Sequence, residues 1–427
     1  MEPARLEKER SGSSGISRRD ILVSSAIGGL SSVLAVPAIG DAATPPVAIS
    51  RWRQAKLLDA VVDGAVNDRH IVGAIVIAAK DGEIVYRRAV GFADREARRP
   101  MVEDAVCRLA SMTKPIVCVA ALALIDRGRL HLDDPVMRWL PDFRPKLSDG
   151  REPVINVRQL LTHTAGLTYG FLEPRKGPYH RLGISDGLDA SGLTLNENLQ
   201  RIAAAPLLFE PGTNWHYSLA VDVLGAIVER VTGLPLAEAV RQIVTEPLGM
   251  ASVTFTVSPA TVLATPYGDA SPQPERMTDP FALEFGQSEI VYSPARAFDS
   301  KAYPSGGVGM VGTAMEYLRF LEAMRTGGAG VIRPETAAMM TRNAIGDLVV
   351  GPAGPGFGWG LGVAVLKDPA EAKLPLGTGA WSWAGVYGTN FWVDPAAKLS
   401  VVVLTNTAVA GMNGRFPLAL RHAAYAS

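Results

Sequence analysis

Ser111 and Lys114 form an S-x-x-K sequence that places a hydroxyl nucleophile and an amine three residues apart. On a helix, residues at this spacing lie on one face, so the amine can take the hydroxyl proton. Pro115 and the apolar residues 116–125 follow, which predicts a buried helix that starts here and stops at residues 127–128. The free N–H groups at a helix N-terminus favour an oxyanion. The pattern predicts a nucleophilic serine; the alternative is an N-cap serine beside a solvated lysine.

Two later stretches give this pair a context. Residues 160–167 read L-L-T-H-T-A-G-L, and residues 210–220 contain Tyr217, just before an amphipathic stretch at 222–232. In this order and at these separations, they and the S-x-x-K sequence resemble the class C β-lactamase and penicillin-binding-protein serine hydrolase family, from about residue 53 to the C-terminus. The family's second motif usually reads Y-x-N. Here it reads Y-S-L, so the Tyr is retained and the Asn is absent.

The third family motif, normally K-T-G, is replaced by residues 383–388, which read W-A-G-V-Y-G. In the family the Lys of K-T-G helps to hold a substrate carboxylate, so the indole of Trp383 stands where the resemblance implies a cation. This departure resembles the β-lactamase-like carboxylesterases of family VIII and related acyltransferases. The R-T-G at residues 325–327 mimics K-T-G, but it follows apolar residues at helical spacing in 316–324. We interpret it as the end of that helix.

The resemblance implies acyl transfer through a covalent intermediate on Ser111. Lys114 and Tyr217 would share the role of general base, for which burial must lower the pKa of at least one of them from about 10 by a few units. The sequence does not decide which group carries the proton, so the two are treated as a coupled pair. The oxyanion would be held by the backbone N–H of Ser111 and, by resemblance, by that of Val386.

The substrate is expected to contact the third motif and nearby aromatic residues. The residues expected there are Trp383, Ala384, Gly385, Val386 and Tyr387. Trp381 and Tyr169 would extend this wall into an apolar acyl or alcohol pocket, with ordinary core packing as the alternative. His216 precedes Tyr217 and would help to orient it, whereas His163 is interpreted as a packed or hydrogen-bonded residue.

The sequence therefore favours a serine carboxylesterase for small to medium carboxylic esters. The alternatives are a β-lactamase or D-amino-acid peptidase, an acyltransferase that uses an alcohol, and a non-catalytic scaffold of the penicillin-binding type. The α/β-hydrolase design, which needs a nucleophile elbow followed by Asp and His, is not favoured. No cofactor and no metal are expected, because the His and Cys spacings typical of zinc sites do not appear.

The charge balance argues against a polyanionic partner. The 427 residues contain 42 Lys and Arg against 42 Asp and Glu, which leaves no net field to attract nucleic acid. We expect a small-molecule ester substrate and no stable membrane partner unless the export signal stays uncleaved; the oligomeric state is not encoded in any readable pattern. Cys107 and Cys118 are not expected to form a disulfide, because the bridge would distort the helix start.

Residues 1–43 resemble a twin-arginine export signal. Arg18 and Arg19 precede a mildly apolar stretch to about residue 38, with small residues through residue 43. Cleavage between about residues 40 and 44 would place the mature enzyme in the periplasm or outside the cell. An uncleaved anchor and a leader with a chance arginine pair are the alternatives.

The family resemblance implies an α+β sandwich, in which helices flank an antiparallel sheet built from both ends of the chain and a mostly helical domain is inserted. Strand-like runs at residues 74–92, with a hairpin turn at 80–83, and at residues 357–405 agree with it.

The expected domain boundaries follow from the same pattern. The sheet domain would comprise residues 47–145 and 301–427, and the helical domain residues 146–300. Two long stretches rich in Gly, Pro and Asp, 168–194 and 258–300, are expected to be irregular and to cover or shape the site.

Overall fold

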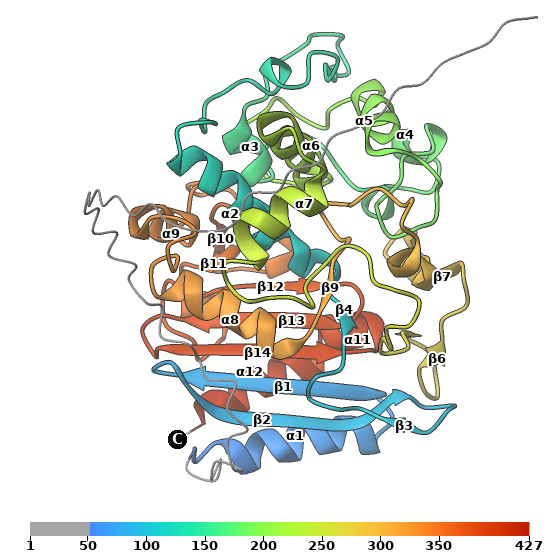
Figure 1. Ribbon diagram of the computed structural model, residues 1–427, viewed down its shortest axis with the longest axis vertical. Helices are drawn as coiled ribbons and strands as arrows, with labels where there is room; N and C mark the ends of the chain where they lie inside the picture. Colours follow the sequence, from blue (N-terminus) through green and yellow to red (C-terminus); the bar gives the residue numbers. More distant parts are fainter. Residues whose placement is uncertain (1–51, 427) are drawn as a thin grey trace, which may run out of the picture. The chain divides into compact units, whose positions relative to one another are not determined.

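An eight-stranded antiparallel sheet lies at the centre of the protein, whose computed structural model describes residues 52–426 (Figure 1). The strand order is β10-β11-β12-β13-β14-β1-β2-β3. Strands from both ends of the chain meet where β1 pairs with β14, from Ala74 opposite Thr405 to Lys80 opposite Leu399. The predicted sheet is therefore confirmed.

The strands of the large sheet are β1 (Gly73–Lys80), β2 (Glu83–Asp94), β3 (Arg99–Pro100), β10 (Phe357–Trp359), β11 (Ala364–Leu366), β12 (Trp381–Gly385), β13 (Thr389–Asp394) and β14 (Leu399–Thr405). Three small sheets pair β4 (Cys107–Arg108) with β9 (Val311–Gly312), β5 (Tyr267–Gly268) with β6 (Glu275–Arg276), and β7 (Phe281–Phe285) with β8 (Ser288–Tyr292). The α-helices are α1 (Ala55–Asn67), α2 (Thr113–Asp126), α3 (Val157–Leu161), α4 (Pro178–Arg181), α5 (Leu195–Ala204), α6 (Ala220–Thr232), α7 (Leu236–Val240), α8 (Ala314–Arg325), α9 (Pro334–Met340), α10 (Pro369–Ala372), α11 (Ala408–Met412) and α12 (Arg415–Tyr425). Short 3₁₀ turns occupy η2 (Ala110–Met112), η3 (Val136–Arg138), η4 (Gly170–Leu172), η6 (Pro294–Phe298) and η7 (Gly351–Ala353), and a π-helical segment, η5 (Arg241–Thr245), continues α7.

The hairpin between β1 and β2 forms at the turn that the sequence predicts. Asp81 and Gly82 connect the strands, and both have positive φ, 54° and 85°. A two-residue turn with positive φ at both central positions has the twist that matches its strands. The hairpin therefore presents β1, an almost fully buried strand, for pairing with β14.

Helices cover both faces of the sheet. α1 and α12 pack against each other on one face, and α8 lies against β1 and β14 on the opposite face (Figure 1). The helices α6 and α7 pack against α2, and α3 packs against α6. This arrangement confirms the predicted fold class. The predicted boundaries of the two domains stay a prediction, and the export signal predicted for residues 1–43 lies outside the described residues.

The helix that carries Lys114 is buried along nearly all of its length. α2 starts at Thr113, directly after η2, and its C-cap is Arg127, so both ends agree with the sequence prediction. α8 ends at Arg325, which confirms the interpretation of the R-T-G sequence as a helix end. Cys107 and Cys118 are both free and buried.

The prediction that residues 258–300 are irregular is wrong. This stretch contains the β5–β6 and β7–β8 hairpins. Burial alternates along β8, which is the pattern of a strand with one covered face. The many Gly, Pro and Asp residues of the stretch belong to the turns between these short strands. Residues 168–194, by contrast, contain only η4 and the single turn of α4.

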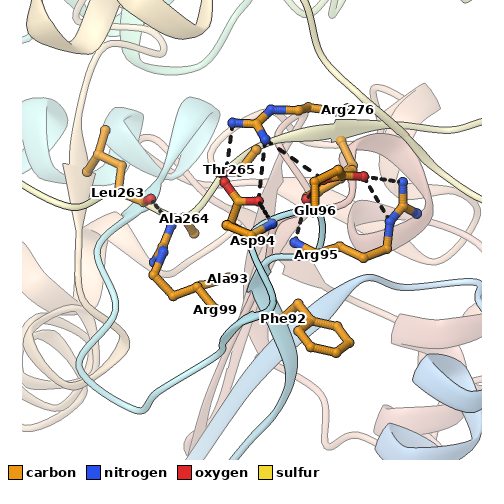
Figure 2. Close-up of polar contacts among 12 residues, drawn as sticks. Phe92, Ala93, Asp94, Arg95, Glu96, Arg99, Leu263, Ala264, Thr265 and Arg276 are labelled. Atoms are coloured by element: carbon orange, nitrogen blue, oxygen red, sulfur yellow. Dashed lines mark hydrogen bonds and ion pairs between the residues drawn. The ribbon is translucent and has the colours of Figure 1, made fainter.

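A charged cluster attaches the β5–β6 segment to the end of β2. Arg276 forms an ion pair with Asp94 at 3.2 Å, and Thr265 donates a hydrogen bond to the same carboxylate at 2.8 Å (Figure 2). Glu96 accepts a hydrogen bond from Tyr267 at 2.5 Å. Burial alone would raise the pKa of Asp94, but hydrogen bonds from Ala97 N–H and Thr265 and the nearby Arg276 hold it below its usual value. The segment is therefore held to the sheet by an ionised carboxylate.

Within residues 52–426, no helix combines the length and the apolar character that crossing a bilayer requires.

Candidate active site

Ser111 and Lys114 face each other at the start of α2. Lys114 Nζ lies 3.2 Å from Ser111 Oγ and donates a second hydrogen bond, of 2.8 Å, to Gly307 O. Ser111 sits in the middle of η2, and the residue before it, Ala110, has a φ of 45° in the left-handed region. Ser111 is 4% exposed and Lys114 is 0% exposed. The 3₁₀ turn thus delivers the hydroxyl to the amine in a site almost closed to solvent.

Burial changes the acid–base character of Lys114. Removal from water disfavours the ammonium and lowers the pKa of Lys114 to about 7, although the carboxylate of Asp222 acts in the opposite direction. Burial therefore favours the neutral amine over the ammonium. A neutral amine 3.2 Å from the Ser111 hydroxyl has the geometry and the lone pair of a general base.

Tyr217 completes the group of polar atoms around Ser111. Its ring lies 4.5 Å from Lys114 Nζ, and its hydroxyl accepts a hydrogen bond of 3.1 Å from Trp383 Nε1. Burial raises the pKa of Tyr217, and hydrogen bonding with Ser111 and Trp383 only partly offsets that effect. The phenol therefore keeps its proton near neutral pH. Of the two candidate bases that the sequence left coupled, the geometry and burial favour Lys114.

The indole of Trp383 makes a specific contact, which predicts the effect of its removal. Phenylalanine at this position keeps an apolar ring against Trp359, whose ring centroid is 4.6 Å away, but deletes the N–H donated to Tyr217. We expect Trp383→Phe to lower kcat for an ester substrate by about threefold to tenfold, the value of one neutral hydrogen bond. Steady-state kinetics on p-nitrophenyl butyrate measures it.

Trp381→Phe is the matched control, because Trp381 is fully buried, packs its ring against Phe391 and makes no contact with Tyr217. Equal losses in both variants would mean that the indole of Trp383 acts by packing alone. Trp381 was expected either to line the pocket or to pack in the core. Its burial and its packing against Phe391 place it in the core of the sheet.

The end of β12 lies directly against the turn that carries Ser111. An ideal Cβ on Gly385 would stand 2.6 Å from Thr389 Oγ1 and 3.1 Å from Ala110 Cβ, and closer still to Leu109 O. Only glycine permits this approach. Tyr292 donates a hydrogen bond of 2.9 Å to Val386 O, which fixes the backbone just beyond Gly385. The Val386 N–H and the Ser111 N–H are thereby held on neighbouring segments, as an oxyanion hole requires.

The rest of the third motif forms a wall on both sides of this contact. Ala384 is half-buried on β12. Tyr387 is buried, meets the ring of Tyr292 edge-on at 4.9 Å and lies beneath the guanidinium of Arg108. Because Tyr292 belongs to β8, the stretch that was predicted to shape the site does reach it, as a hairpin.

Several aromatic residues of the site lie outside the predicted set. Trp359 on β10 and Trp215 pack on each other at 5.3 Å and enclose Tyr217 together with Trp383. Tyr169, which was in the predicted set, is fully buried, with its ring 5.2 Å from Tyr217 and 5.1 Å from Lys114 Nζ, so it belongs to the site. Trp215 lies in the 210–220 motif, two residues before Tyr217, but nothing in the local sequence around Trp359 distinguishes it from a core tryptophan. Only the fold brings them together.

His163 is packed and hydrogen-bonded as expected, whereas His216 makes no hydrogen bond that would orient Tyr217. His216 donates or accepts a 2.9 Å hydrogen bond with Thr168 through Nε2 and does not contact the Tyr217 hydroxyl. His163 is fully buried, bonds Ser218 Oγ at 3.1 Å and packs its ring 4.9 Å from that of Tyr217. Burial and the nearby Lys114 hold the pKa of His163 well below its usual value. His163 is therefore the neutral imidazole that supports Tyr217.

Residues 183–187 read G-I-S-D-G and match the G-x-S-x-G pattern, but they do not form a nucleophile elbow. Ser185 is 1% exposed and lies in a loop, where it hydrogen-bonds Asp189 and accepts 3.2 Å and 3.1 Å bonds from Tyr303 and the Gly187 N–H. The α/β-hydrolase elbow instead exposes its serine on a turn between strand and helix. Ser185 therefore has a structural role.

Comparison with known families agrees with the fold. The fold is that of the serine hydrolases of the β-lactamase type. The family model described as Beta-lactamase matches residues 58–425, so the chain belongs to the β-lactamase family, as the motifs implied.

Individual relatives show which members of the family the chain resembles. Esterase EstB of Burkholderia gladioli is 51% identical over 372 residues, covering 86% of this chain and 94% of that protein. The solved structure of EstCE1, described as a hydrolase with promiscuous acyltransferase activity, matches with a TM-score of 0.84 and 46% identity over 87% of this chain and 98% of that one. A monacolin J acid methylbutanoyltransferase of Aspergillus terreus is 30% identical over 309 residues, 68% of this chain and 71% of that protein.

Proposed function

We propose that the protein is a serine carboxylesterase that hydrolyses small to medium carboxylic esters through an acyl-enzyme on Ser111. The observation that carries this proposal is the indole of Trp383, which hydrogen-bonds Tyr217 at the position where a β-lactam-recognising enzyme of this family has a lysine. Without a cation there, the site favours a neutral ester over a substrate held by its carboxylate. The similarity to EstB supports the same substrate class.

The proposed reaction begins with transfer of the Ser111 hydroxyl proton to neutral Lys114 Nζ. Ser111 Oγ attacks the ester carbonyl, and the oxyanion that forms is held by the N–H groups of Ser111 and Val386. Collapse breaks the bond to the leaving alkoxide, which takes the proton from Lys114, with the Tyr217 hydroxyl as a hydrogen-bonding neighbour of both oxygens. A water molecule then gives a proton to Lys114 and attacks the acyl carbon. The bond from the acyl carbon to Ser111 Oγ breaks, and Lys114 returns the proton to Ser111 Oγ, which releases the acid and restores the hydroxyl and the neutral amine.

The proposal is tested by measuring turnover of p-nitrophenyl butyrate and nitrocefin side by side. A fluorophosphonate probe, followed by mass spectrometry of the labelled peptide, identifies the nucleophile. We expect ester turnover to far exceed nitrocefin turnover and the adduct to lie on Ser111. Dominant nitrocefin turnover would make the protein a β-lactamase, and the absence of both turnover and adduct would make it a binding scaffold.

Acyl transfer to an alcohol is the second candidate function, because EstCE1 is described as having promiscuous acyltransferase activity and the Aspergillus terreus relative is named a transferase. The nearly closed surroundings of Ser111 limit the access of water to the acyl-enzyme. Product analysis in the presence of 1-butanol separates the two functions. Butyl butyrate in excess of butyric acid would favour the transferase.

We also propose export by the twin-arginine route to the periplasm or the medium. Arg18 and Arg19, followed by a mildly apolar stretch that ends in small residues, support it.

A further inference from the structure

Three buried polar atoms converge on Gly307, behind the Ser111–Lys114 pair. An ideal Cβ on Gly307 would stand 2.5 Å from Asp222 Oδ2, 2.7 Å from the Tyr169 hydroxyl and 3.5 Å from Lys114 Nζ. The missing side chain of Gly307 thus leaves the carboxylate and the amine facing the same small space. Gly307 also accepts the 2.8 Å hydrogen bond from Lys114 Nζ through its carbonyl, so its backbone fixes the amine as well.

Asp222 is unusual in its burial and in its partners. It lies in the first turn of α6 and is fully buried, and its Oδ1 accepts a 2.6 Å hydrogen bond from Ser305. Its Oδ2 and the Tyr169 hydroxyl have no hydrogen-bond partner among the described residues, although the Gly307 N–H lies near enough to the carboxylate to lower its pKa somewhat. A buried carboxylate with one unpaired oxygen is costly unless a nearby positive charge compensates it.

A purely structural role for Asp222 would be to hold Ser305. That role uses only Oδ1, and a neutral asparagine would fill it equally well. Holding Ser305 does not explain why Oδ2 faces the space shared with Lys114. A carboxylate placed behind a base, where the base becomes a cation during the reaction, is the arrangement that stabilises such a cation in other acyl-transfer sites.

We propose that Asp222 is a positioning residue that stabilises the ammonium formed when Lys114 takes the Ser111 proton, across the space left open by Gly307. The inference deepens the proposed function, because it concerns the base of the same acyl transfer. The proton moves from Ser111 Oγ to Lys114 Nζ and later to the leaving oxygen, and Asp222 remains a carboxylate throughout. Ser111, Lys114 and Asp222 therefore act as one series of nucleophile, base and counter-charge.

The charged and titratable groups around Asp222 come from every neighbouring element. They are Lys114 and Cys118 of α2, Tyr169 and Asp186 of the loop 168–194, Tyr217 before α6, Arg296 of η6, and Tyr303. Among these, Lys114 and Arg296 favour the ionised carboxylate, whereas burial opposes it and raises the pKa of Asp222. Lys114 is the cation that the reaction itself creates and removes.

Asp222→Asn tests the proposal, because the amide keeps the shape and the acceptor for Ser305 but loses the charge. In the wild type, kcat/KM for p-nitrophenyl butyrate should rise with pH as Lys114 loses its proton. In the variant, loss of the neighbouring carboxylate should move this rising limb to lower pH by at least about 1 unit. It should also lower kcat at pH 8 by about tenfold to a hundredfold with little change in KM, since Asp222 stabilises the transition state without binding the substrate. If the rising limb of the pH profile stays where it is in the wild type, the proposal is overturned.

Asp186→Asn is the matched control. Asp186 is a half-buried carboxylate of the same region, and both of its oxygens accept hydrogen bonds, from the Gly170 and Phe171 N–H groups. Its substitution should leave the limb in place even if it lowers the thermal stability. An equal shift in both variants would show a general effect of removing a negative charge from this region, which also overturns the proposal.

Gly307→Ala provides an independent test that keeps both charged groups. The added methyl group would occupy the shared space and push Oδ2 away from Lys114, so the limb should move in the same direction as in Asp222→Asn. Circular dichroism and thermal unfolding establish which variants are folded. If the rising limb of a folded variant lies at the wild-type pH, the proposal is contradicted.

The rate at which a fluorophosphonate labels Ser111, measured across the same pH range, tests the role of Asp222 separately from the esterase function. A limb that shifts in labelling, in a protein without ester turnover, would retain the role of Asp222 and reject the esterase.

Discussion

Lys114→Met is expected to lower kcat/KM for p-nitrophenyl butyrate by about a thousandfold or more while leaving the thermal stability nearly unchanged. Methionine matches the lysine stem in length, so the packing inside α2 is retained. The loss of activity follows because, among residues 52–426, no other neutral base lies at hydrogen-bonding distance from Ser111; the phenol of Tyr217 keeps its proton. Enzyme kinetics and a thermal melt of the same preparation measure both effects.

Two opposing effects determine the thermal stability of Lys114→Met. A buried amine loses its hydration, and replacing a buried polar group by an apolar one of similar volume is often neutral or stabilising. Against this, Gly307 O loses its 2.8 Å hydrogen bond, which costs about 1 kcal/mol or more. Lys301→Met, an exposed lysine of the same chain, is the control and should retain full activity. A melting temperature that falls together with the activity would assign Lys114 a structural role instead.

Gly385→Ala is expected to lower kcat by about a hundredfold to a thousandfold, the range for losing one oxyanion-hole donor. The methyl group cannot fit between β12 and the turn that carries Ser111, because it would stand 2.6 Å from Thr389 Oγ1 and 3.1 Å from Ala110 Cβ. The strand end must move away, and the Val386 N–H moves with it. KM should change much less than kcat, since the donor acts on the developing oxyanion.

Gly64→Ala is the matched control for this substitution. Gly64 lies inside α1, an added Cβ there meets nothing within 4 Å, and no positive φ is required. The control should keep its activity and gain about 0.5–1 kcal/mol in free energy of unfolding, the usual difference between glycine and alanine in a helix. A Gly385→Ala variant with normal kcat would show that the Val386 N–H does not bind the oxyanion.

The parts of the site that could be predicted are those whose meaning is local. The spacing of Ser111 and Lys114, together with the apolar helix that follows, predicts the pair from the sequence. In the structure, Lys114 Nζ lies 3.2 Å from Ser111 Oγ. Tyr217 and Trp383 could be placed because each stands inside a motif with a fixed order along the chain. The hairpin of β1 and β2 was predictable for the same reason, since its turn chemistry is contained in two residues.

The parts that could not be predicted depend on distant segments meeting. Asp222 reads as an ordinary first-turn acid of an amphipathic helix, and only the fold places it behind Lys114, with Gly307 leaving the space between them. Which of Lys114 and Tyr217 is the base depends on their burial and hydrogen bonds, which spacing does not encode. The β7–β8 hairpin was missed because the turn-rich composition around it outweighs two five-residue strands.

The pairing of β1 with β14 sets the order in which this protein can form during synthesis. β1 acquires β2 as soon as the hairpin leaves the ribosome, but its other edge stays unpaired until residues 399–405 have been made. A nascent chain therefore carries an apolar strand with a free edge for most of its translation, a state that invites pairing with other chains. Because the turn that carries Ser111 rests on β12 and β13, and β13 pairs with β14, the nucleophile becomes competent only when nearly the whole chain is available.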